Sequence, residues 1–394
     1  MTAATPALLL PDGELGPDEL AFAQRIRAFA AAALAPHARA IDEQRTFRRE
    51  MVHDLGRAGI LGGPLRPENG GEGWAPLQVA IAHEELGAVC SNARGFCAVQ
   101  TGLVAQCLER FANPAQQQRW LPALARGTAI GCFALTEPEA GSDVANLTTR
   151  AERTGPGRYA LHGRKWWITN GGAADVAIVF ANADPAAGKK GITAFLVDTA
   201  RPGLTRGPVP GIELGHRGSD HAELVFDGLA VTDDDNVGGF GKGFGVAMGG
   251  LAAGRISVAA GAVGIHRRAL AATVEFTTSR RQFGQALAAF QMVQERLADH
   301  FAALHAARAL VWRCARRRAA GAETPADVAM AKLFATEAAA KACEDAVLLH
   351  GARGYSSAHP VERLWRDIQA LRIYEGTSLI QKTILARLVA PTGD

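Results

Sequence analysis

Apolar residues recur at intervals of three and four over the first third of the chain, with polar residues between them. This period places the apolar side chains on one face of a helix, so it predicts helices over residues 18–126. Glycine and proline clusters at residues 62–64 and 69–71 mark breaks between these helices. The face of the first helix consists of Phe22, Ile26, Phe29 and Ala33.

The pattern changes near Ile130 to short apolar runs bounded by turns, which is typical of strands. Asn170 and Gly171 stand between two of these runs and predict a tight hairpin, because both residues tolerate positive φ. We therefore expect a small antiparallel β unit in the middle of the chain. Its runs are Cys132–Leu135, Lys165–Thr169, Val176–Phe180, Ile192–Val197 and Ala222–Phe226.

Helical periodicity returns after the glycine-rich residues 238–245 and continues to the end. Thr324 followed by Pro325 predicts a capped helix start, and Gly351 predicts where that helix ends. An order of helices, strands and helices argues against a repeated βαβ unit. The sequence predicts an α+β fold with units at residues 1–127, 128–236 and 237–394.

The composition points to a globular protein, with 48% hydrophobic and 21% charged residues among 394. The formal charge is only +3, so we expect no nucleic-acid partner. Residues 1–14 lack the basic start and apolar run of a signal peptide, and charges interrupt the alanine-rich stretches, so we expect a cytoplasmic protein without a membrane partner. The six cysteines form no C-x-x-C pair and lack a His at metal-ligand spacing, which predicts reduced thiols and no metal.

Several catalytic signatures are missing from the sequence. It has no G-x-G-x-x-G after a predicted strand, no P-loop, no G-x-S-x-G elbow and no H-E-x-x-H helix. Nicotinamide-dependent, nucleotide-binding, hydrolytic and metalloprotease functions therefore have no support.

Four segments, in order along the chain, together resemble the acyl-CoA dehydrogenase family. They are Leu135–Asp143 (LTEPEAGSD), Lys165–Gly171 (KWWITNG), Ser279–Gly284 (SRRQFG) continuing to Phe290 and Gln291, and Tyr374–Ser378 (YEGTS). The resemblance implies FAD as cofactor and α,β-dehydrogenation of an acyl thioester. It also implies an N-terminal helical domain, a middle antiparallel β domain, a C-terminal four-helix bundle and a homotetramer built as a dimer of dimers.

The resemblance assigns the flavin ring to the first two segments. Backbone and hydroxyl donors there would face the electron-rich edge of the ring, which accumulates negative charge on reduction. Trp167 would cover one face of the ring and Thr169 would hydrogen-bond near N5, while Trp166, on the opposite face of the strand, is expected in the core. Simple core packing of both tryptophans is the alternative. The implied donors are Leu135, Thr136, Gly141 and Ser142.

Glu375 is implied as the base that removes the α proton, a role that needs a desolvated carboxylate whose pKa burial has raised. Some relatives carry the base on the helix near Arg255, but the corresponding residue here is Gly254. The alternative for Glu375 is an ion pair with Arg372 at a helix end. The implied substrate contacts are Ser142, Arg255, Tyr374 and Gly376.

A further set of residues matches positions where the family, across a dimer interface, contacts the pyrophosphate and adenine of FAD. A planar guanidinium suits phosphate, although Arg280 could equally be a solvated charge at a helix terminus. The chain departs from the family in having Leu379 where many members carry Gln, and in having residues 348–354 (LLHGARG) where a Gln followed shortly by Gly-Gly is common. The implied set is Arg280, Phe283, Gln291, Gly351 and Thr377.

The substrate carrier stays open at this level. Residues 90–95 resemble the same segment in a branch of the family whose members act on acyl groups bound to carrier proteins. Acyl-CoA and acyl-carrier protein are therefore both candidate substrates. The cluster Arg313 and Arg316–Arg318 could meet an acidic carrier or CoA phosphates, or could simply stabilise a helix C-terminus. Electron transfer flavoprotein is the implied electron acceptor. Other possibilities are an oxygen-dependent thioester oxidase, a flavin monooxygenase and a catalytically idle flavin-binding protein.

Overall fold

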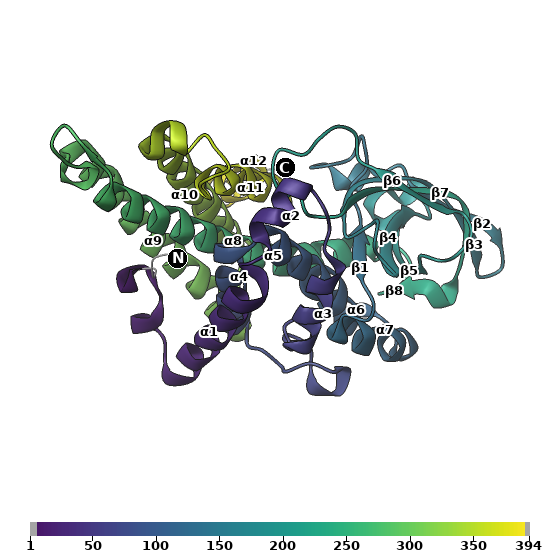
Figure 1. Cartoon of the computed structure of the whole chain (residues 1–394). Coiled ribbons are helices and arrows are strands. Elements are labelled where there is room, and N and C mark those ends of the chain that lie inside the picture. The colour runs from purple at the N-terminus through teal and green to yellow at the C-terminus, as the bar shows by residue number, and fades with distance from the viewer. Residues whose placement is uncertain (1–5, 391–394) are drawn as a thin grey trace.

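The computed structural model describes residues 6–390. The first five residues of the expected N-terminal unit and the last four of the expected C-terminal unit lie outside the described residues, as does part of the segment 1–14 that was compared with a signal peptide. Most helices gather on one side of the molecule and the sheet lies on the other, with α6 and α7 beneath the sheet (Figure 1). The predicted order of helices, strands and helices is confirmed, and the fold is α+β.

The first helical block follows the predicted apolar pattern, with Phe22 and Ile26 buried and α1 packed on α4. Asn113 caps α7 by accepting a hydrogen bond from the backbone N–H of Gln116 at 2.9 Å, which is why that helix begins there. A π-helical stretch, Ala98–Ala105, joins two helices without a break. The helices are α1 (Pro17–Phe29), α2 (Ala38–Gln44), α3 (Arg49–Arg57), α4 (Pro76–Val89), α5 (Ser91–Cys97), α6 (Gln106–Phe111) and α7 (Pro114–Arg126).

The middle block forms a sheet whose path runs β6-β7-β3-β2-β4-β5-β8, with β1 beside β4. All five predicted runs fall on strands, and only Leu135, at the end of the first run, lies beyond its strand. The sheet is mixed rather than purely antiparallel, because β4 pairs in parallel with both β1 and β2. The strands are β1 (Gly131–Ala134), β2 (Arg150–Gly155), β3 (Arg158–Thr169), β4 (Val176–Asn182), β5 (Ile192–Asp198), β6 (Leu204–Pro208), β7 (His221–Thr232) and β8 (Asn236–Val237).

The predicted hairpin at Asn170-Gly171 is wrong. Asn170 does have a positive φ of 67°, but β3 pairs with β2 and β7, and β4 pairs with β1, β2 and β5. The turn therefore changes the direction of the chain between two strands that are not neighbours. A local turn signal gives the conformation of the turn but not the partners of the flanking strands.

The last block packs around the long helix α8, which contacts α4, α9, α10 and α11, while α12 lies on α10. The predicted caps of α10 are confirmed: Thr324 accepts from the backbone N–H of Asp327, and Gly351 ends the helix with a φ of 60°. The elements are α8 (Gly243–Ser279), β9 (Arg281–Gln282), β10 (Gln285–Ala286), α9 (Gln291–Ala319), α10 (Pro325–His350), α11 (Val361–Ile373) and α12 (Ser378–Val389).

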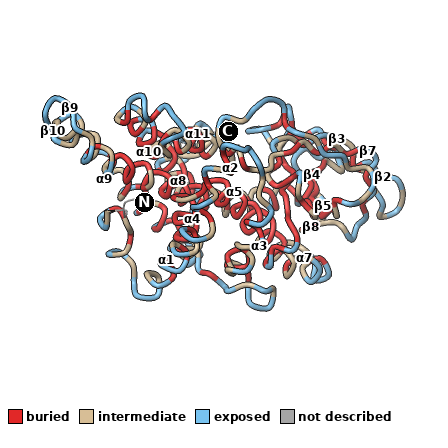
Figure 2. Tube along the Cα trace, viewed as in Figure 1, coloured by how far each residue is buried: buried red, intermediate tan, exposed pale blue. Residues whose placement is uncertain are grey.

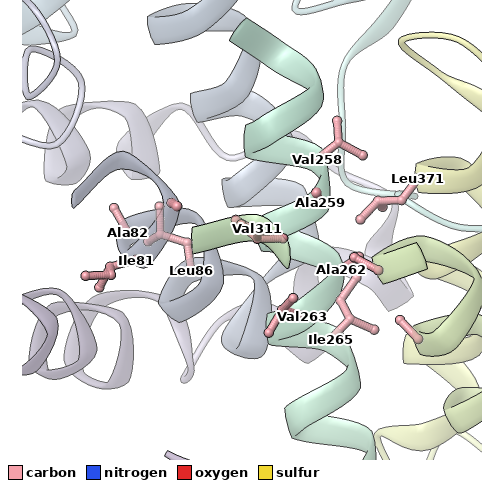
Figure 3. Close-up of a cluster of buried hydrophobic side chains, with 14 of the residues drawn as sticks. Ile81, Ala82, Leu86, Val258, Ala259, Ala262, Val263, Ile265, Val311 and Leu371 are labelled. Atoms are coloured by element: carbon pink, nitrogen blue, oxygen red, sulfur yellow. The ribbon is translucent and has the colours of Figure 1, made fainter. Parts of the chain in front are cut away.

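Helix α8 is the centre of the helical core. Its residues Val258 and Ala262 lie among side chains from α4, α9 and α11 (Figure 3), and buried residues follow its length (Figure 2). By length and composition alone α8 could cross a membrane, yet 67% of its most apolar window is buried inside the protein. Its apolar surface is therefore used for internal packing.

Candidate active site

A cavity of about 120 Å³ lies where the sheet meets the helices. Its wall combines residues from segments that are far apart in the sequence, so no single element forms it. Of the residues predicted for the site, the structure brings six together here: Leu135, Thr136, Trp167, Thr169, Tyr374 and Glu375.

Glu375 lies in the short connection between α11 and α12 with a φ of 56°, a left-handed conformation that few non-glycine residues adopt. Its Oε2 is buried and has no hydrogen-bond partner within the described chain. A Cβ at Gly254 would overlap this carboxylate, so the glycine on α8 makes the space that Glu375 fills.

Burial raises the pKa of Glu375 to about 7, against the opposing effect of the positive charges of Arg94, Lys332 and Arg255. A carboxylate that is poorly solvated and half ionised near neutral pH can accept a proton from a weakly acidic carbon. The local chemistry therefore suits a general base.

The connection that carries Glu375 is held by hydrogen bonds to its carbonyl oxygens. Arg255 Nε donates to the carbonyl of Glu375 at 2.8 Å, and Gln381 Nε2 donates to that of Gly376 at 2.9 Å. The Lys332 ammonium also donates to the Gly376 carbonyl. Arg255 and Gly376 thus position the loop that carries the carboxylate.

The alternative pairing of Glu375 with Arg372 is not found. Arg372 instead forms an ion pair with Glu337 at 2.8 Å, and Ser378 also donates to Glu337. Thr377 uses its hydroxyl to cap α12, accepting from the backbone N–H of Ile380 at 3.2 Å. The carboxylate of Glu375 is therefore left free to face the cavity.

The two sequence segments on the sheet side are tied together by a buried ion pair. Lys165 Nζ lies 2.7 Å from Glu137 Oε1, and both side chains are almost completely buried. Glu137 also accepts from the backbone N–H of Thr149 at 2.9 Å. The backbone N–H of Trp166 donates to the Thr136 carbonyl at 2.9 Å, so Thr136 and the tryptophan segment form one rigid wall.

Trp167 meets the cavity with 47% of its surface exposed and a φ of 57°. An indole held at this conformation with an open face suits stacking against a planar ring, so the residues present fit an isoalloxazine at this wall. Trp166 does not pack in the core as predicted. It is half-buried, and its Nε1 donates to Glu223 at 2.8 Å, because the indole N–H requires a polar partner.

Six of the other predicted residues, namely Gly141, Ser142, Arg280, Phe283, Gln291 and Gly351, are not among the residues that line the cavity. Gly141 and Ser142 are exposed on the loop after β1, and Gly351 is exposed at the end of α10. Phe283 and Gln291 follow Arg280, which comes directly after the end of α8 and 25 residues beyond Arg255. At 1.5 Å per residue this is roughly 38 Å, so one chain does not bring them to its own cavity.

Sequence reasoning missed three polar residues of the cavity wall, Arg94, His216 and His221. Arg94 is completely buried, and His216 is 2% exposed with its Nε2 2.9 Å from Ser91 Oγ. A signal for Arg94 existed, because it is the only charged residue between Glu85 and Glu109. A lone arginine in such an apolar run marks a buried charge that needs an explanation.

Comparison with known proteins agrees with this arrangement. Family models match residues 16–128 (Acyl-CoA dehydrogenase, N-terminal domain), 132–229 (middle domain) and 241–390 (C-terminal domain). A short-chain specific acyl-CoA dehydrogenase of Clostridium acetobutylicum is 39% identical over 92% of this chain and 95% of its own. This chain belongs to the acyl-CoA dehydrogenase family.

Two solved structures extend the comparison. A glutaryl-CoA dehydrogenase from Mycobacterium smegmatis in complex with FADH2 has a TM-score of 0.92 and 32% identity, covering 97% of each chain. The prolyl acyl carrier protein oxidase AnaB has a TM-score of 0.91 and 30% identity, covering 95% of this chain and 100% of its own. The protein is an FAD-dependent oxidoreductase that acts on CH–CH groups.

Proposed function

We propose that this enzyme dehydrogenates a small acyl thioester between its α and β carbons, with Glu375 as the base that takes the α proton. The observation that carries the proposal is a buried carboxylate, with its pKa raised to about 7, in a cavity that Trp167 also lines. FAD held beside Trp167 and Thr169 would supply the acceptor for the β hydride.

The enolate that forms when the α proton leaves requires stabilisation at the thioester oxygen. We assign this to the backbone N–H of Glu375, whose position is fixed by the hydrogen bond from Arg255 to the carbonyl of the same residue. Ser142, Tyr374 and Gly376 remain proposed substrate contacts, and Leu135, Thr136, Gly141, Ser142 and Thr169 remain proposed flavin contacts.

Replacement of the base tests the proposal. Glu375→Gln should retain FAD yet lose at least ~1000-fold in the rate at which an acyl thioester bleaches the flavin under anaerobic conditions, because the amide cannot accept the proton. The matched control is Glu139→Gln, which makes the same change at an exposed carboxylate in the loop between β1 and β2. Its rate of flavin bleaching should equal that of the unmodified enzyme. Undiminished bleaching by Glu375→Gln would assign the proton transfer to another residue.

A second candidate function is a carrier-protein-linked thioester oxidase that uses oxygen directly. The similarity to a prolyl acyl carrier protein oxidase favours it. Turnover that needs electron transfer flavoprotein and yields no peroxide would support a dehydrogenase, whereas stoichiometric peroxide would support the oxidase. Both proposed substrates, acyl-CoA and acyl-carrier protein, are supplied in this assay.

We further propose a cytoplasmic homotetramer, built as a dimer of dimers, whose units are residues 1–127, 128–236 and 237–394. In this assembly Arg280, Phe283 and Gln291, with Gly351 and Thr377, would hold the pyrophosphate and adenine of FAD across a subunit interface. Phe283 supports the proposal, since it is 94% exposed in the turn between β9 and β10. Its ring centroid lies 6.2 Å from that of Phe290, and most of the Phe283 side chain is left open to a partner subunit.

A further inference from the structure

A second cavity, of about 160 Å³, lies at the junction of α2, α8 and the start of α11. None of the residues that line it also lines the cavity of Glu375. Helix α2 lies beside α11 here (Figure 1), and the ion pair of Asp42 with Arg366 joins the two helices. The second cavity therefore belongs to the boundary between the N-terminal and C-terminal helices, and the proposed reaction does not use it.

Two arginines that line the second cavity have no partner in the chain. The guanidinium groups of Arg268 on α8 and Arg363 on α11 form no hydrogen bond or ion pair with any group of residues 6–390. Both side chains are only partly exposed, so water reaches them incompletely. A guanidinium has five N–H donors and stays charged in proteins. The second cavity thus contains charged donors that the chain itself does not satisfy.

The acidic residues of the second cavity are already bound to other arginines. Asp42 accepts two hydrogen bonds from Arg366, at 2.9 and 2.6 Å. Glu362 accepts two more from the same guanidinium, at 2.7 and 3.1 Å. Glu43 pairs with Arg39 at 2.8 Å, where both side chains are exposed. No carboxylate of the second cavity is therefore left to pair with the other two arginines.

Arg268 and Arg363 also repel each other. Burial lowers the pKa of Arg268 below its ordinary value; the charge of Glu275 opposes this effect, and the charge of Arg363 adds to it. Glu275 does not approach closely enough to form an ion pair with Arg268. Two like charges held together in a partly buried cavity are unfavourable unless an anion lies between them.

The backbone adds further positive potential to the second cavity. Helix α11 begins at Val361, directly after the lining residues Ser357 to Pro360, and no side chain caps its first turn. Free N–H groups and the positive end of the helix dipole favour an anion at such a position. The hydroxyl of Ser357 also has no hydrogen-bond partner in the described part of the chain. Amide and hydroxyl donors therefore supplement the two guanidinium groups.

We propose that the second cavity binds a phosphate group, either as the free ion or at the end of a small ester, between Arg268 and Arg363. Phosphate carries close to two negative charges near neutral pH and accepts bidentate hydrogen bonds from guanidinium groups. Two cations therefore suit a phosphate better than a carboxylate. The volume of the cavity corresponds to roughly five water volumes, so it admits a phosphate and a few further atoms but not a nucleotide.

A bound phosphate would connect helices that are far apart in the sequence. Arg268 belongs to the central helix α8 and Arg363 to the first turn of α11. Helix α11 ends at Ile373, directly before Tyr374 and Glu375, so the ligand would stabilise the helix whose far end leads to the base. The phosphate site does not depend on the proposed reaction, because it uses no residue that lines the cavity of Glu375.

Calorimetry measures binding to the FAD-loaded enzyme in a phosphate-free buffer at about pH 8, where a phosphate group is mostly a dianion. Inorganic phosphate and glycerol 3-phosphate distinguish the free ion from an ester. Acetate at the same ionic strength tests whether a single negative charge is enough. The absorbance of the flavin is followed in parallel, because a ligand that acted at the flavin would change it.

We expect a single site per chain with a Kd on the order of 1 mM or below for at least one of the two phosphates, and binding of acetate that is at least ~10-fold weaker. Arg268→Gln should weaken phosphate binding by at least ~10-fold, because hydrogen bonds between charged groups are strong in a partly buried site. Arg268→Lys should retain part of the affinity, because an ammonium keeps the charge but lacks the planar fork of donors. Arg57→Gln, at an arginine whose side chain is 78% exposed, is the control and should bind phosphate normally.

Thermal unfolding separates a ligand site from an arginine that serves only the fold. Phosphate should raise the unfolding midpoint of the unmodified enzyme, because a ligand that binds only the folded chain stabilises it. Arg268→Gln should lose this increase. Without phosphate its midpoint should be at least as high as that of the unmodified enzyme, because the change removes an unpaired and repelled charge. An arginine that served only the fold would lower the midpoint equally with and without phosphate.

A chemical probe reports on both arginines without any substitution. Phenylglyoxal reacts with accessible guanidinium groups, and peptide mass spectrometry gives the extent of reaction at each arginine. Phosphate should slow the modification of Arg268 and Arg363 and leave that of Arg57 unchanged.

Three results would each overturn the phosphate site. They are binding of acetate as tight as that of both phosphates, unchanged phosphate binding by Arg268→Gln, and modification of Arg268 that phosphate does not slow. Tighter binding of inorganic phosphate would assign the site to the free ion, whereas tighter binding of glycerol 3-phosphate would assign it to a phosphate ester. Flavin bleaching by thioesters tests the dehydrogenase function separately, so the two proposals stand or fall independently.

Discussion

At the scale of single residues, the site depends on two glycines as much as on its polar side chains. Gly254 and Gly261 leave space on α8 for the Glu375 carboxylate and the Arg94 guanidinium. Each of these polar groups is buried with at least one unpaired atom. Such unpaired groups are costly in a fold and concentrate where a ligand completes them.

Gly254→Ala should retain the fold but impair catalysis, because the added methyl group overlaps the Glu375 carboxylate and displaces it. We expect a decrease of roughly 100-fold in anaerobic flavin bleaching, given how strongly small misplacements affect proton transfer. Gly245→Ala is the control on the same helix, since a Cβ there meets nothing within 4 Å. Equal rates for the two variants would show that Glu375 tolerates displacement.

The raised pKa of Glu375 predicts how stability depends on pH. Between its ordinary value of 4.5 and about 7, the folded chain holds a proton that the unfolded chain has released. The free energy of unfolding therefore falls as pH rises through this window. Glu375→Gln lacks this loss, so its stability relative to the unmodified enzyme should be greater at pH 8 than at pH 4, by at most about 3 kcal/mol.

Denaturant unfolding of both FAD-loaded proteins at the two pH values measures this difference. A relative stability that does not change with pH would mean that the carboxylate is well solvated, contrary to its buried position.

At the scale of elements, the buried pair Glu137–Lys165 joins the loop after β1 to strand β3. The backbone N–H of Thr149 also donates to Glu137, so the carboxylate connects three segments of the wall that is proposed to face the flavin. The resemblance to the family identified both segments, Leu135–Asp143 and Lys165–Gly171, from the sequence. It did not show that an ion pair connects them.

Glu137→Gln should lower the free energy of unfolding by roughly 3–5 kcal/mol, because it leaves the Lys165 charge buried without a counter-ion. The double variant Glu137→Gln/Lys165→Met should recover part of this loss. Urea unfolding measures both, with Asp54→Asn, at a surface ion pair, as a control that should cost less than about 1 kcal/mol. If the single and double variants lost the same stability, the pair would not be coupled.

At the scale of the whole molecule, α8 connects the cavity to the exposed hairpin β9–β10, roughly 38 Å from Arg255 to Arg280 at 1.5 Å per residue. Three of the residues proposed for the adenine end of FAD, Arg280, Phe283 and Gln291, lie on or beside that hairpin. A complete cofactor site therefore requires a second chain under the proposed assembly.

Phe283→Ser should lower both the oligomeric mass and the FAD content, because it removes an apolar contact from the proposed interface. Light scattering coupled to size exclusion gives the mass, and the ratio of flavin to protein absorbance gives the content. Ile212→Ser, at a 76% exposed residue of the sheet unit, is the control and should alter neither. A monomer with a full complement of FAD would contradict the cross-subunit site.

The basic cluster of Arg313 and Arg316–Arg318 forms contacts that stabilise the fold of a single chain. Arg313 and Arg317 lie 3.4 Å and 2.9 Å from Asp327. Arg318 donates to the carbonyl of Ala252. These pairs link α9 to α10 and α8, so the interpretation as internal stabilisation is favoured over an exposed docking patch.

The sequence by itself determined the class of fold, the positions of the main strands, the caps of α10 and the segments of the site, because periodicity, capping and turn chemistry are local properties. Only the tertiary structure decided the strand partners around Asn170, the polar contact of Trp166 and the approach of Gly254 to Glu375 and of Gly261 to Arg94. These features join residues up to 280 positions apart, as in the contact of Arg94 with Tyr374. Burial and charge in such a contact are set by what packs around it, which no local pattern records.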